Sequence, residues 1–118
     1  MSWHAICTID RLTADRGVAA LVDGDEVAVF LLSTGELFAV DNADPFSGAA
    51  VLARGLVGET AGVPFVASPV YKQRFDLRTG ACLDAVGKEP VALLTYPVQV
   101  REGTVLVSGV PAPGDPGT

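Results

Sequence analysis

The chain has 118 residues, of which 49% are hydrophobic and 19% are charged, a composition typical of one folded domain. Its formal net charge of −6 excludes the basic surface that nucleic-acid binding requires, and no uncharged apolar stretch approaches the roughly 18 residues that span a bilayer. Residues 1–10 lack a basic segment followed by a long apolar one, so we expect a cytoplasmic protein without a membrane anchor. We expect one domain over residues 1–110 and a flexible tail, rich in Pro and Gly, over residues 111–118.

Short strands joined by turns are predicted for the first third of the chain. Abundant valine and 13 glycines favour strands over long helices, so the predicted fold class is all-β. The expected strands are residues 3–9, 17–22, 26–32 and 36–40. The run at 26–32 (EVAVFLL) is continuously apolar and is expected to be buried on both faces. The turn at 33–35 joins it to residues 36–40 in a hairpin.

Loops and short strands alternate in the rest of the chain. The expected elements are a helical turn near 49–53, strands near 56–58 and 63–67, a hairpin of 73–76 with 81–84, and a hairpin of 94–100 with 104–108. The last hairpin has the clearest alternation of apolar and polar residues. Pro97 has no N–H to donate, so either its strand is a sheet edge or its missing N–H points outward.

Known catalytic motifs are missing from the sequence. The one histidine, His4, lies in an expected strand, and there is no HExxH, GxSxG, GxGxxG or GxxxxGK[ST] motif. Hydrolytic and nucleotide-dependent catalysis are therefore disfavoured. Asp41, Asn42 and Asp44 form an acidic cluster without the closing glutamate of a calcium loop, so an Asx turn is favoured there.

Two loops that contain proline, 24 residues apart, carry the most specific signal. The segment 68–80 (SPVYKQRFDLRTG) resembles the second cluster-binding box of Rieske-type ferredoxins, Cys-Pro-x-His-Gly-x-x-Phe-Asp-x-x-Thr-Gly. The segment 44–49 (DPFSGA) lies where that family carries its first box, Cys-Pro-His-x-Gly-Ala. The resemblance implies an all-β, Rieske-like (ISP) sandwich of two small antiparallel sheets, with a cluster-binding-like subdomain at about 41–84.

The ligand positions of both boxes are changed. A Rieske centre binds one iron through two Cys thiolates and the other through two His imidazoles. Here Asp44 and Ser68 stand at the Cys positions, and Phe46 and Tyr71 stand at the His positions. Oxygen atoms do not reproduce that coordination, and Phe46 has no donor atom. We therefore expect the fold without a [2Fe-2S] cluster, and no metal, cofactor or catalytic residue on this chain. Phe46 is expected to pack where a ligand would point, and the Tyr71 hydroxyl to bond across the gap.

A chain that has these two segments but lacks the four ligands resembles the small subunits of assimilatory NAD(P)H-dependent nitrite reductases. The resemblance covers roughly residues 3–110. The resemblance implies that the chain belongs to a cytoplasmic complex that reduces nitrite to ammonium, and that it is not catalytic alone. It further implies a large subunit that carries FAD, an iron-sulfur cluster and sirohaem, and on which this chain docks.

A group of cations next to aromatic residues predicts where the partner binds. Lys72, Arg74 and Arg78 place three of the eight basic residues within seven positions, beside Tyr71 and the loop of Phe46. Interface cores are enriched in basic and aromatic side chains, so these five residues form the expected partner interface. The alternative is a solvated hairpin whose charges protect a sheet edge from aggregation.

Two other functions stay open at this point. One is electron transfer as a Rieske-type ferredoxin or oxygenase component, which the loss of all four ligands disfavours. The other is an independent enzyme with Cys82 as its nucleophile, which the absence of a nearby cation or second histidine disfavours. We expect both Cys7 and Cys82 to be buried thiols.

Overall fold

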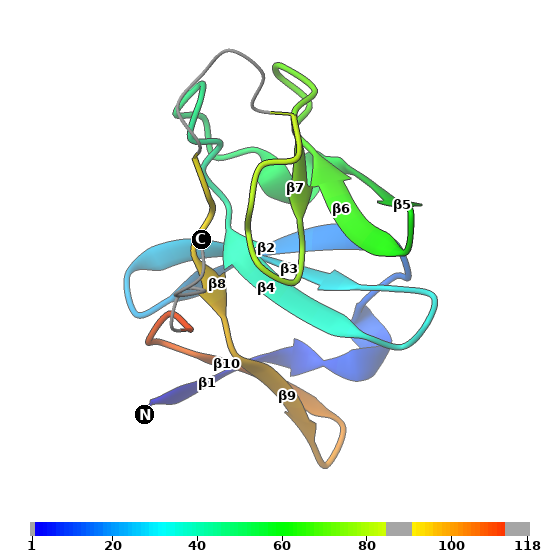
Figure 1. The fold of residues 1–118 in the computed structure, drawn as a ribbon. Helices are drawn as coiled ribbons and strands as arrows, with labels where there is room; N and C mark the ends of the chain where they lie inside the picture. The colour runs from blue at the N-terminus through cyan, green and yellow to red at the C-terminus, as the bar shows by residue number, and fades with distance from the viewer. Residues whose placement is uncertain (1, 85–90, 113–118) are drawn as a thin grey trace.

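The computed structural model describes residues 2–84 and 91–112, which form three small antiparallel sheets (Figure 1). The first sheet has the order β1-β10-β9 and consists of β1 (Trp3–Thr8), β10 (Thr104–Ser108) and β9 (Val98–Arg101). The second has the order β2-β3-β4-β8 and consists of β2 (Arg16–Val22), β3 (Asp25–Leu31), β4 (Leu37–Asp41) and β8 (Thr95–Tyr96). The third has the order β5-β6-β7 and consists of β5 (Leu56–Thr60), β6 (Val63–Ala67) and β7 (Arg74–Asp76). The short 3-10 helices η1 (Ile9–Arg11) and η2 (Leu52–Arg54) complete the described elements.

Strand β3 separates two hydrophobic cores. Its residues 27–30 are fully buried, as the apolar run predicted. Because side chains alternate along a strand, Ala28 and Phe30 face one core while Val27 and Val29 face the other. The first core lies under the third sheet and includes Val66, Phe75, Leu77 and Leu52; the second lies against the first sheet and includes Val105, Val107 and Tyr96. The all-β fold class is therefore confirmed, with two sheets as the base and a third sheet above them (Figure 1).

The predicted strand at 94–100 is divided at Pro97. Residues 95–96 form β8 and pair with β4, while residues 98–101 form β9 and pair with β10. Since proline cannot donate to a ladder, the chain changes sheets at this residue, and its carbonyl accepts a hydrogen bond from Ser108 N at 2.9 Å. Both β8 and β9 are edge strands, in agreement with the prediction.

Other expectations differ from the structure at single segments. The predicted strand at 81–84 forms only isolated bridges, Phe75 with Cys82 and Ala81 with Ala92. The cysteines are half-buried rather than fully buried, and Cys7 and Cys82 pack against different cores. Residues 113–118 of the expected tail lie outside the described residues. Among the residues that are described, no helix is long and apolar enough to cross a membrane.

Gly80 closes the turn after β7 and allows a comparison that tests the packing. A Cβ there would lie 2.1 Å from the carbonyl oxygen of Leu93, and φ is +80°. Gly35, in the β3–β4 turn, has φ +93° but open space around it. We expect Gly35→Ala to cost about 1 kcal/mol of unfolding free energy through backbone strain alone. Gly80→Ala should cost about 2 kcal/mol more because of the steric overlap. Urea denaturation of both variants measures the difference, and equal losses would contradict the close packing.

Candidate functional site

Three loops of the chain share one pattern of backbone hydrogen bonds. In each, the first residue donates its N–H to the carbonyl five residues later, and the residue four positions later donates its N–H back to the first carbonyl. The bonds are Asp44 N to Ala49 O (2.8 Å) and Gly48 N to Asp44 O (2.7 Å), Ser68 N to Gln73 O (2.9 Å) and Lys72 N to Ser68 O (3.0 Å), and Asp76 N to Ala81 O (2.8 Å) and Gly80 N to Asp76 O (2.7 Å). The two loops that resemble cluster-binding boxes are therefore built like the turn that follows β7.

The first side chain of each loop also accepts a hydrogen bond from the N–H two residues later. Asp44 Oδ1 accepts from Phe46 at 2.8 Å, Ser68 Oγ from Val70 at 3.3 Å, and Asp76 Oδ1 from Arg78 at 2.8 Å. The Asx turn predicted at Asp44 is thus confirmed. Sequence reasoning missed the shared loop, although an Asp or Ser followed four residues later by Gly would have indicated two of the three.

The fifth residue of each loop has a positive φ, a region that favours glycine. The angles are +77° at Gly48, +80° at Gly80 and +66° at Lys72. Two loops thus place a glycine where the backbone is left-handed, and the third places a lysine there.

The two box-like loops are joined by one hydrogen bond. Ser68 Oγ donates to Asp44 Oδ2 at 2.5 Å, and both residues are completely buried. These two side chains occupy the positions at which the resembling boxes carry cysteine. The prediction that the Tyr71 hydroxyl bonds across the gap is wrong: among the described residues Tyr71 has no such bond and is 58% exposed. Ser68 joins the two loops instead.

Phe46 anchors the first loop to the core. Its ring lies 6.1 Å from the ring of Phe75, centroid to centroid, at an interplanar angle of 35°. Phe75 is fully buried at the centre of β7, and Phe46 is partly buried against the same core. Phe46 therefore packs inward, as expected for a side chain without a donor atom.

The predicted cations do not gather at one place. Tyr71, Lys72 and Arg74 lie in or directly after the loop 68–73, whereas Arg78 lies at the opposite end of β7. Arg74 forms a bidentate ion pair with Asp84, with Nε and Nη2 each 2.8–2.9 Å from a carboxylate oxygen. This hydrogen bonding lowers the pKa of Asp84 from its usual range. Both arginines of the predicted interface are thus paired, since Arg78 binds Asp76 at 3.1 Å.

Burial and pairing act against each other at Asp76. Burial raises the pKa of its carboxyl group, but the hydrogen bonds from Arg78 outweigh that effect, so the pKa lies below its usual range. The Arg78 side chain remains exposed on the rim of a cleft.

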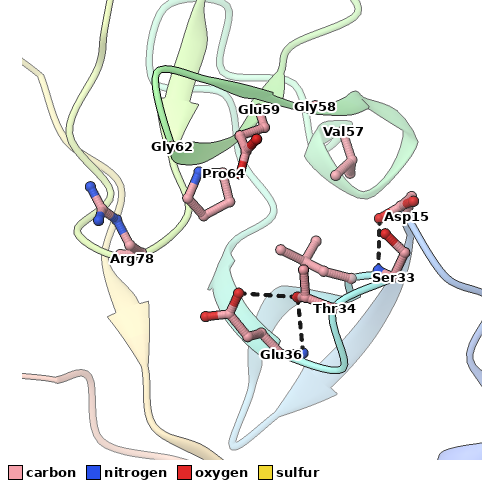
Figure 2. Close-up of a pocket in the computed structure, with 11 residues that line it drawn as sticks. Asp15, Ser33, Thr34, Glu36, Val57, Gly58, Glu59, Gly62, Pro64 and Arg78 are labelled. Carbon is pink, nitrogen blue, oxygen red and sulfur yellow. Dashed lines mark hydrogen bonds between the residues drawn. The ribbon is translucent and has the colours of Figure 1, made fainter.

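This cleft of about 370 Å³ lies between the β3–β4 turn and the β5–β6 hairpin (Figure 2). Several polar groups that line the cleft are hydrogen-bonded to one another: Ser33 N donates to Asp15, and Thr34 Oγ1 donates to Glu36 at 3.1 Å. Sequence reasoning missed the cleft because it joins turns that are more than 20 residues apart.

The chain matches the Rieske-like [2Fe-2S] domain family over residues 2–108. It is 41% identical over 108 residues to a nitrite reductase (NADH) small subunit of Salmonella typhimurium, covering 91% of this chain and 97% of that protein. The chain belongs to the Rieske-like domain family, among the nitrite reductase small subunits.

Solved structures and a longer relative extend this result. A crystal structure of a Mycobacterium tuberculosis protein, assigned as an NADH-dependent nitrite reductase small subunit, superimposes with a TM-score of 0.84 at 46% identity and covers 90% of this chain and 93% of that chain. A nitrite reductase [NAD(P)H] large subunit of Klebsiella oxytoca is 40% identical over 105 residues, which are 89% of this chain and 11% of that protein.

The side chains at the four box positions do not fit the [2Fe-2S] cluster of the Rieske-like family. Asp44 and Ser68 are hydrogen-bonded directly to each other, so no iron or sulfide fits between them. Phe46 packs inward against Phe75, and Tyr71 faces outward. Within the described residues, no group of three or more His, Cys, Asp or Glu side chains is placed to hold a metal ion.

The Asp44–Ser68 bond gives a direct stability prediction. Ser68→Ala should lower the unfolding free energy by about 2–3 kcal/mol, because one oxygen of a buried carboxylate loses its donor. Asp44→Ala should have a similar effect, and the double variant should lose at least about 1 kcal/mol less than the two single losses combined. Urea denaturation of the four proteins measures this coupling. Strictly additive losses would contradict a bond between the two side chains.

The Arg74–Asp84 pair predicts a dependence of stability on pH. The pKa of Asp84 in the folded state lies below its unfolded value of about 3.9. The contribution of the pair to stability is therefore present above that pH and is lost as the pH falls through the folded-state pKa. Asp84→Asn should therefore destabilise the protein at pH 7, and the loss should become smaller at an acidic pH below the unfolded pKa. In an Arg74→Met background the pH dependence of the Asp84→Asn effect should become smaller without disappearing, because the backbone N–H of residue 74 still donates to Asp84. Denaturation midpoints at both pH values decide the outcome, and a constant difference would refute the linkage.

Proposed function

We propose that this chain is the non-catalytic small subunit of an NAD(P)H-dependent nitrite reductase and acts by binding the large subunit. The observation that carries the proposal is the direct Asp44–Ser68 bond in a chain whose relative is named a nitrite reductase small subunit. With the two loops joined in this way, the described residues leave no place between Asp44 and Ser68 for the redox centre of the family. The contribution of the chain to the reaction therefore comes from contact with the subunit that performs it.

The Klebsiella oxytoca relative supports the choice of partner. There, a region 40% identical to this chain forms part of a protein named as the large subunit. A domain of this kind is thus attached covalently to the remainder of that polypeptide. In this chain the same association would be non-covalent.

The proposal assigns the redox groups to the partner. FAD, sirohaem and an iron-sulfur cluster belong to the large subunit, and the complex reduces nitrite to ammonium in the cytoplasm. The contact expected from the sequence includes Phe46, Tyr71, Lys72, Arg74 and Arg78. Because Phe46 packs inward and Arg78 lies at the opposite end of β7, the proposed contact centres on the loop 68–73. Tyr71 and Lys72 are exposed, which supports a contact at the loop 68–73.

Titration of the purified large subunit with this chain tests the proposal. NAD(P)H-dependent nitrite reduction, or the thermal stability of the large subunit, should rise and saturate at a fixed molar ratio. A control titration with Phe75→Ala, which should lose about 3–5 kcal/mol of stability, shows whether the folded chain is required. No binding and no effect of the intact chain would refute the proposal.

A second experiment separates this role from electron transfer. The chain purified without oxygen and incubated with iron and sulfide should give no visible or electron paramagnetic resonance spectrum of a Rieske centre. A stoichiometric cluster with such a spectrum would instead favour a ferredoxin function.

A further inference from the structure

Lys72 occupies a backbone position at which the two loops of the same pattern, here called the sister loops (44–49 and 76–81), carry glycine. All three loops close with the same two hydrogen bonds, and all three have a positive φ at the fifth residue. At Gly48 and Gly80 the absence of a Cβ makes this conformation favourable. At Lys72 the same conformation strains the backbone, and the loop forms nonetheless.

Neither turn geometry nor an ion pair explains the lysine. The other exposed non-glycine residues with positive φ are aspartates or stand directly before glycine in two-residue hairpin turns, as Ala61 and Glu102 do. Lys72 lies in the longer loop between β6 and β7. Among the described residues no carboxylate lies within ion-pair distance of it, and its side chain is exposed. The strained position therefore presents to solvent a positive charge that no described residue compensates.

An outward-facing apolar row borders this loop. The strand register places Leu56 opposite Ala67, and Ala67 opposite Arg74. Leu83 donates its N–H to the carbonyl of Arg74 and continues the row. The neighbouring row, Val57, Val66, Phe75 and Cys82, packs into the first core, so alternation directs the row of Leu56 to the opposite face. Leu56 is 74% exposed and Leu83 is 37% exposed.

The arginine in this row does not make the face strongly polar. Its charge is neutralised by the bidentate pair with Asp84, and its guanidinium lies 5.5 Å from the ring centre of Phe65. That ring in turn covers Gly58, where a Cβ would come within 2.7 Å of it. The outer side of the third sheet is thus an apolar surface with a stacked arginine, the composition typical of an interface core.

We infer that Leu56, Leu83, Val70, Tyr71 and Lys72 form the docking surface for the large subunit, and that Lys72 binds a carboxylate on it. These residues are defined here as the loop-end surface; the loop between β6 and β7, which carries three of them, lies at the top of Figure 1. Four of the ten large exposed hydrophobic residues of the described chain belong to it. The inference rests on the proposed function and deepens it.

Two observations favour the large subunit as the protein that binds this surface. Within residues 2–84 and 91–112 the patch is apolar with Lys72 as its one unpaired cation, so charge complementarity favours an apolar partner surface edged by a carboxylate. The Klebsiella oxytoca large subunit carries a region 40% identical to this chain within its own polypeptide, which supports the large subunit as the protein on which such a domain packs. A second copy of this chain would instead bring two lysines and two equal apolar rows together.

Binding of the full-length chain to the purified large subunit, measured by calorimetry, tests the surface. Leu56→Ser should weaken binding about tenfold, whereas Leu21→Ser, 71% exposed on β2, should not change it. Lys72→Gly should also weaken binding about tenfold, remove much of the salt dependence, and leave the melting temperature of the chain equal or up to about 5 °C higher. Lys72→Arg should retain most of the affinity. Glu102→Gly, which relieves the same backbone strain in the β9–β10 turn, should leave binding unchanged.

The outcomes separate this inference from the proposed function. If the unaltered chain binds the large subunit but Leu56→Ser and Lys72→Gly bind equally well, the surface is wrong and the proposed function stands. If Leu21→Ser weakens binding instead, the docking surface lies on β2 and the inference is overturned. If the unaltered chain does not bind at all, both fail.

Discussion

The arrangement of the loops 44–49 and 68–73 depends on a hydrogen bond between two buried side chains, Ser68 and Asp44. A carboxylate in a protein interior is unfavourable unless donors surround it, and here a hydroxyl and the N–H of Phe46 supply them. The bond fixes the separation of two loops that are 24 residues apart in the sequence. Because Phe46 packs on Phe75, it also connects the loops to the first core.

A loop that is closed by its own backbone hydrogen bonds does not require particular side chains at its tip. The loop 68–73 and its two sister loops form the same pair of hydrogen bonds with different side chains, so the loop conformation does not depend on a bound group. This explains why a fold whose family name refers to an iron-sulfur cluster persists in a chain whose four box positions hold Asp, Phe, Ser and Tyr. In this chain Phe46 packs on the core, Asp44 and Ser68 bond to each other, and Tyr71 is exposed.

Local sequence signals predicted most of the fold. The strands at 26–32 and 104–108 followed from apolar runs and alternation, and the box-like loops from their motif. The Asp44–Ser68 bond did not, because which side chain spans a gap depends on distances that separate segments adopt only after folding. The same limit applies to the cations: Lys72 and Arg78 are six residues apart, yet a strand lies between them and directs them to opposite ends. The partners of Arg74 and Arg78 also required the three-dimensional structure, since Asp84 reaches Arg74 only through the return of the chain after Gly80.

The change of sheet at Pro97 couples the two base sheets in unfolding. Strand β8 is held to β4, partly through the Tyr96 hydroxyl that donates to Asp41, and β9 is held to β10, with a single residue between them. Peeling either edge strand away therefore strains the other within one peptide unit. We expect the amides of both sheets to exchange with solvent through one shared opening, so that the base behaves as a single cooperative unit.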